Sequence, residues 1–147
     1  MRIERHIQSI VLALILFLNF LFLLDVCVAG EQFPPKASIW SHNGSAVKID
    51  SIGPTIEIVY DEPREGLQTE GVTKGTLLFK GTKLVESDAI SGVAFIFSSK
   101  CGPVPYSVAG IINGKTKQIK LEGNAPKIDK STCTIIGKIN DSLLFNY

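Results

Sequence analysis

Histidine, cysteine, tryptophan and methionine are all scarce in this 147-residue chain, which holds two, three, one and one of them. Beyond residue 30 the only histidine is His42 and the only cysteines are Cys101 and Cys133. A hydrolytic triad needs a base beside its nucleophile, and a zinc or iron site needs several ligands at short spacing. No Gly-x-Ser-x-Gly elbow occurs. We therefore expect no metal, no cofactor and no catalysis.

Runs of charge of one sign are also lacking. The 15 lysines and arginines and 14 aspartates and glutamates leave a net charge of +1, and the lysines are scattered along the chain. A protein that binds nucleic acid usually carries a basic stripe. The sequence therefore excludes a nucleic-acid partner and indicates an unspecialised surface.

One long apolar run is present, and it lies at the N-terminus. Arg2 and Arg5 precede the run over residues 10–24, IVLALILFLNFLFLL, which is followed by DVCVAG. A basic start, an apolar stretch and small residues predict a signal peptide over residues 1–29, cleaved after Ala29. The alternative is an uncleaved segment that anchors the chain to a membrane. Val26 precedes Cys27 where lipidation needs a small residue, so we do not expect a lipoprotein.

The remaining residues, 30–147, are expected to form a single β-rich domain in the periplasm or outside the cell. In an exported chain, Cys101 and Cys133 are first interpreted as a disulfide. Closing a loop of about 32 residues would stabilise the fold by about 3.5–4 kcal/mol in the chain-entropy estimate. A metal pair or a reactive thiol remains the alternative.

Helical periodicity is lacking after residue 30, and short alternating apolar runs are broken by Gly, Pro, Asn or Asp every eight to twelve residues. Two Asn-Gly hairpins and further strands give roughly eight to ten strands, which favours a small antiparallel barrel, with a two-sheet β-sandwich as the alternative. The further predicted strands are 55–60, 76–79, 83–87, 92–98, 132–139 and 142–147.

The first hairpin is predicted around Asn43 and Gly44, since a two-residue turn favours Asn-Gly. Trp40 then faces Val47 and His42 faces Ser45, so the tryptophan points into the core. His42 shares that face at its last position before the turn. It is interpreted as a hydrogen-bonded residue at the core's edge, or alternatively as a ligand contact above a Trp40 floor.

The second hairpin is predicted around Asn113 and Gly114. Its two-residue turn pairs Val108 with Ile119 and Tyr106 with Leu121. These four apolar residues share one face and polar residues share the other.

The longest polar connection, residues 61–75, gathers four carboxylates around Arg64. Pro63 and Gly66 indicate a turn, in which Arg64 neutralises its acidic neighbours. The spacing does not match a calcium loop. A carboxylate-based hydrolase is a remote alternative. The carboxylates are Asp61, Glu62, Glu65 and Glu70.

Several stretches resemble a group of small exported proteins of alphaproteobacteria, the rhizobia and their relatives. These stretches are WSHNGS, YDEPREGL, GTLLFKG, SGVAFIFSSKCGPVPYSVAG and LLFNY. The group shares Trp-x-His-Asn-Gly-Ser, Pro-Arg-x-Gly and Gly-Thr-Leu-Leu-Phe motifs. The resemblance implies a periplasmic or extracellular bacterial protein, and it implies no activity.

Two modes of action remain open at this point. In the first, aromatic and aliphatic side chains fill the barrel and the protein acts through surface contacts with an unidentified partner. In the second, a hollow barrel binds a small apolar or amphipathic ligand near Trp40, His42 and Tyr106, with Arg64 as a loop contact. The side chains expected to fill the interior are Leu78, Phe79, Phe95, Phe97 and Phe145.

Overall fold

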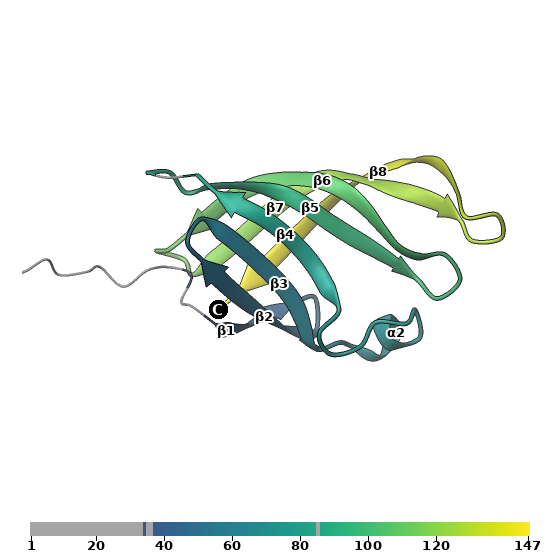
Figure 1. Cartoon of the computed structure of the whole chain (residues 1–147), viewed down its shortest axis with the longest axis horizontal. Helices are drawn as coiled ribbons and strands as arrows, with labels where there is room; N and C mark the ends of the chain where they lie inside the picture. Colours follow the sequence, from purple (N-terminus) through teal and green to yellow (C-terminus); the bar gives the residue numbers. More distant parts are fainter. Residues whose placement is uncertain (1–33, 35–36, 85) are drawn as a thin grey trace, which may run out of the picture. The chain divides into compact units, whose positions relative to one another are not determined.

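Eight antiparallel strands close into a barrel in the computed structural model, which describes residues 34, 37–84 and 86–147 (Figure 1). Each strand pairs with the next in the sequence, and the eighth returns to the first. The predicted all-β antiparallel barrel is confirmed. The predicted signal peptide and its cleavage site lie outside the described residues. No helix in the described ranges is long and apolar enough to cross a membrane.

The elements follow one another as a simple meander with one short helical turn. They are β1 (Ser38–His42), β2 (Ser45–Ile52), β3 (Thr55–Glu62), α2 (Glu65–Gln68), β4 (Leu77–Lys83), β5 (Ala89–Ser98), β6 (Gly102–Asn113), β7 (Gln118–Asp129) and β8 (Thr134–Asn146).

Two strand predictions differ from the structure. The predicted strands 132–139 and 142–147 are a single strand, β8, because the polar residues between them stay paired with β7. The predicted strand 83–87 does not form, since β4 ends at Lys83 and the chain turns. Glu86 adopts a left-handed φ of 62° in that turn, and the Leu84 amide donates to the Ala89 carbonyl oxygen at 3.0 Å.

The first hairpin has the predicted register. Trp40 pairs with Val47 and His42 pairs with Ser45. Asn43 and Gly44 have φ values of 46° and 78°, the left-handed conformations that this two-residue turn requires. The local turn chemistry therefore determined the register correctly.

The predicted register of the second hairpin is wrong by four residues. Val108 pairs with Gly123, and Ile112 pairs with Ile119. The Asn113 side chain accepts hydrogen bonds from the backbone amides of Lys115 and Thr116 at 3.0 and 3.1 Å. This Asx-type capping favours a longer turn over the two-residue turn. An even shift preserves the faces, so the apolar side of the hairpin is still the buried one.

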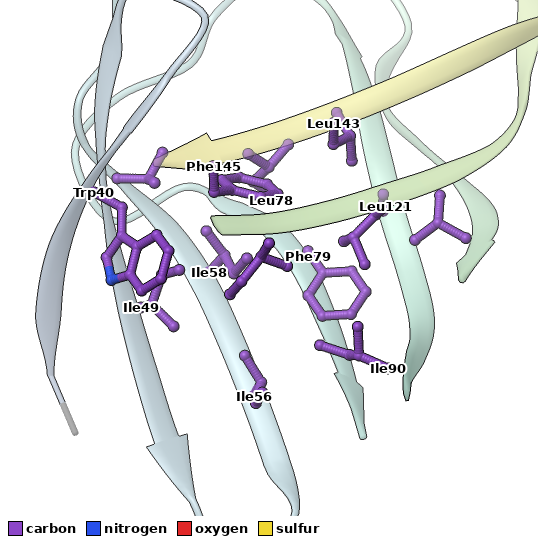
Figure 2. Close-up of a cluster of buried hydrophobic side chains, with 14 of the residues drawn as sticks. Trp40, Ile49, Ile56, Ile58, Leu78, Phe79, Ile90, Leu121, Leu143 and Phe145 are labelled. Carbon is purple, nitrogen blue, oxygen red and sulfur yellow. The ribbon is translucent and has the colours of Figure 1, made fainter. Parts of the chain in front are cut away.

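Large side chains fill the interior of the barrel (Figure 2). Trp40, Phe79 and Phe145 are the largest of the fully buried side chains. Two of the expected interior residues, Phe95 and Phe97, are only half-buried, and Phe97 packs against the edge of the core. The interior is thus a packed core, as in other small barrels.

Glycines occupy positions where neighbouring strands approach too closely for a Cβ atom. Gly81 on β4 pairs with Gly92 on β5. A Cβ atom at Gly92 would lie 2.3 Å from the Lys80 carbonyl oxygen, and one at Gly110 would lie 1.8 Å from the Lys120 carbonyl oxygen. No larger residue fits at either position without moving the backbone.

Strands β6 and β7 separate beyond the pair Val108–Gly123. From there β6 pairs only with β5, and β7 pairs only with β8, among the described residues. The disulfide Cys101–Cys133 joins the tips of these two hairpins, with 5.4 Å between the Cα atoms. The predicted disulfide is confirmed, and it is compatible with an oxidising compartment.

Candidate binding site at the barrel mouth

His42 lies at the end of β1 and is 7% exposed. Its Nδ1–H donates to the Leu144 carbonyl oxygen at 2.9 Å, since a carbonyl oxygen can only accept. The ring also stacks on Phe145, with 4.6 Å between the centroids. Burial lowers the pKa of His42, so the neutral imidazole presents an unprotonated Nε2 at neutral pH.

Two tyrosines approach the same end of the barrel from β3 and β6. Tyr60 is buried, with its ring edge against Phe97 at a centroid distance of 5.9 Å. Burial raises the pKa of Tyr60 to about 12. The Tyr106 hydroxyl donates to the Asp141 carboxylate on β8. Burial, followed by this hydrogen bond, raises the pKa of Tyr106. Both phenols therefore stay protonated at physiological pH.

Arg64 reaches the mouth from the loop between β3 and β4. Its backbone amide donates to the Ser45 hydroxyl at 3.0 Å, which ties the loop to the first hairpin. Its side chain passes over Gly44, where an added Cβ atom would lie 3.8 Å from the arginine Cδ. Arg64 lines the same cavity as His42 and Tyr60.

These side chains line a cavity of about 170 Å³. Aliphatic and aromatic side chains form most of its wall, and Arg64 and Asp141 contribute a charge of each sign. The lining residues are His42, Asn43, Tyr60, Arg64, Leu67, Leu78, Phe95, Ile96, Phe97, Tyr106, Asp141 and Leu143.

Three of the four residues expected at a ligand site come together in this cavity: His42, Tyr106 and Arg64. Trp40 does not line it. The Trp40 indole N–H donates to the Ser38 hydroxyl at 2.7 Å, and the ring contacts that of Tyr147 at 5.2 Å. Phe145, and not Trp40, lies against His42, since β1 continues two residues past the tryptophan.

The sequence prediction missed Tyr60 and Asp141. A signal existed for both residues. Ile56 and Ile58 alternate inward along β3, and the next inward position is Tyr60. Asp141 precedes the buried Leu143 by two residues on β8, so it occupies the same face. Splitting β8 into two predicted strands concealed that periodicity.

The carboxylates of the loop 61–75 do not assemble around Arg64. Asp61 pairs with Lys74 at 2.5 Å, and Glu70 pairs with Lys130 of the β7–β8 turn. The predicted neutralisation by Arg64 is wrong for Asp61 and Glu70, which pair with lysines instead. No group of three or more histidines, cysteines and carboxylates suited to a metal ion occurs within the described part of the chain.

Glu70 also connects the two hairpin tips to the loop that carries α2. Its carboxylate accepts a hydrogen bond from the Ser99 amide at 3.0 Å, in addition to its ion pair with Lys130. The Lys130 ammonium, followed by the Ser99 amide, lowers the pKa of Glu70. In Figure 1 both hairpin tips lie on the same side of the barrel as α2. The loop that carries α2, the β5–β6 turn and the β7–β8 turn thus border the mouth.

Comparisons with protein-family models, curated proteins and solved structures found no significant match to this chain. The resemblance to exported alphaproteobacterial proteins therefore stays a prediction. The barrel and its surface are the features that bear on function.

Proposed function

We propose that this protein is an exported, non-catalytic protein of the bacterial envelope, periplasmic or secreted, that acts through interactions at its surface. The packed interior supports this proposal over a hollow barrel, since large side chains occupy the space that a central ligand would need. The carboxylate-based hydrolase ranks last, because Asp61 and Glu70 are engaged by lysines.

The observation that carries the proposal is an exposed apolar strand segment. Ile135, Ile136 and Ile139 on β8 are 62%, 60% and 62% exposed. We call this group the isoleucine segment. Several large apolar side chains exposed on one short strand segment favour an interaction site there, because a partner would remove them from contact with water.

The backbone of the isoleucine segment is also available on one side. Among the described residues, β8 pairs with β1 only between Asn146 and Ser41, whereas its pairing with β7 extends to Thr134. An open strand edge beside apolar side chains suits a partner that adds an extended segment to the sheet.

Site-specific photo-crosslinking in the native envelope tests this function. A photoreactive residue at Ile136 should give one dominant protein adduct, identified by mass spectrometry. Ile52 on β2 is the matched control, because it is a 72% exposed isoleucine away from the segment. The same adducts from both positions, or none from Ile136, would argue against a surface interaction at β8.

A further inference from the structure

Two polar atoms at the barrel mouth have no hydrogen-bond partner among the described residues. The Tyr60 hydroxyl is one, although that side chain is only 3% exposed, and Nε2 of His42 is the other. Within the same residues, every side-chain nitrogen or oxygen sealed from solvent has a partner. Neither atom is therefore sealed from solvent, and both residues line the cavity. Polar groups in so confined a place need a partner from outside.

The cavity also carries one charge of each sign. Neither Arg64 nor Asp141 has an ion-pair partner in the described part of the chain. Both residues line the same cavity as His42. A simple anion or cation would be attracted by one of them and repelled by the other. A dipolar ligand complements both.

The remaining wall is apolar and determines the size of the ligand's body. Leu67, Leu78, Ile96 and Leu143 contribute to it, and Figure 2 shows Leu78 and Leu143 on the inner side of the barrel. The cavity of about 170 Å³ is close to the roughly 150 Å³ apolar cavity that holds benzene. It is well below the roughly 300–1,000 Å³ of sites for larger ligands.

We infer that this cavity is a binding site for a small zwitterion with an apolar body, in the class of free apolar α-amino acids. The ligand's carboxylate accepts hydrogen bonds from the Arg64 guanidinium and the Tyr60 hydroxyl. Its ammonium group donates to the Asp141 carboxylate and to Nε2 of neutral His42. Its side chain lies against the leucines. This site is separate from the isoleucine segment and does not depend on the proposed surface function.

Isothermal titration of the purified protein with L-leucine and three relatives tests the ligand class. 4-Methylpentanoate lacks the ammonium group, 3-methylbutylamine lacks the carboxylate and glycine lacks the apolar body. We expect L-leucine to bind at least about tenfold more tightly than each relative, as is usual when a charge-assisted hydrogen bond or a buried apolar body is lost. Equal affinity for L-leucine and 4-methylpentanoate, or no binding of L-leucine at millimolar concentration, would overturn the inference.

Two variants test which residue binds each charged group of the ligand. Arg64→Gln should weaken L-leucine binding about tenfold or more and leave 3-methylbutylamine binding unchanged. Asp141→Asn should weaken L-leucine and leave 4-methylpentanoate unchanged. Lys74→Gln is the matched control, because it removes a cation from the same loop but outside the cavity lining.

Asp141 also accepts the hydrogen bond of Tyr106, so folding of its variant is checked by circular dichroism. Should Asp141→Asn unfold, His42→Phe replaces it, because Nε2 of His42 is the other acceptor for the ammonium group; this variant should weaken L-leucine but not 4-methylpentanoate. Unchanged L-leucine affinity in Arg64→Gln would overturn the assignment. None of these outcomes alters the crosslinking expected at Ile136, so the two proposals fail separately.

Discussion

The Tyr106 hydroxyl on β6 donates a hydrogen bond to the Asp141 carboxylate on β8, so it connects two strands that are not neighbours in the barrel. The contact lies just beyond Val108–Gly123, where β6 and β7 stop pairing. It holds the mouth together where the backbone ladder no longer does.

Replacing Tyr106 with Phe should therefore lower the free energy of unfolding by about 1.5–3 kcal/mol, the range for a hydrogen bond to a charged group. Urea denaturation measures the change. Tyr60→Phe is the matched control: it removes a buried hydroxyl without a partner in the described residues, and should stay within about 0.5 kcal/mol of wild type. Equal losses in both variants would mean that the Tyr106–Asp141 bond contributes nothing specific.

Because Cys101 and Cys133 form one disulfide, the losses of unfolding free energy caused by replacing them should not add. Cys101→Ser, Cys133→Ser and the double variant should each lose about 3.5–4 kcal/mol, because any one of them opens the same loop of 32 residues. The urea midpoints of the three should coincide. A double variant that loses the sum of the two single losses would show that the cysteines act independently.

Trp40, the only tryptophan, reports directly on the core. At 2% exposure, its fluorescence should be blue-shifted and poorly quenched by iodide. Trp40→Ala should cost about 3–5 kcal/mol, since a large cavity would remain beside Val47 and its neighbours. A solvent-like emission spectrum of the folded protein would contradict the register of the first hairpin.

His42 predicts a pH dependence of stability. Its pKa is lowered in the folded protein by burial, so the unfolded chain binds a proton more readily as the pH falls. The free energy of unfolding should therefore decrease from about pH 6.5 downward, through the lowered folded-state pKa. His42→Gln should flatten this slope between about pH 6.5 and 5, above the range in which carboxylates titrate. Identical slopes for the two proteins would exclude His42 as the cause.

Sequence reasoning predicted the barrel, the disulfide and the first hairpin because each depends on local or compositional signals. Alternation of apolar and polar residues specifies which face is buried. Asn43-Gly44 specifies a two-residue turn through the positive φ values that it adopts. The same dipeptide at Asn113 misled the prediction, because a side-chain hydrogen bond stabilises a longer turn there. The alternation of apolar and polar residues does not reveal a register shift by an even number of residues, because the same side chains stay buried.

The mouth of the barrel was only partly predictable. His42, Tyr106 and Arg64 were identified as candidates one by one, each from its residue type and position. Only closure of the barrel brings them to one cavity with Tyr60 and Asp141, from strands far apart in the sequence. Closure also decides that Phe145, and not Trp40, lies against the histidine. In the two hairpins the sequence alone determined which side chains face inward, because that follows from the two-residue period of a strand. The tertiary structure decided which of them meet, because strand register and curvature arise from contacts across the whole barrel.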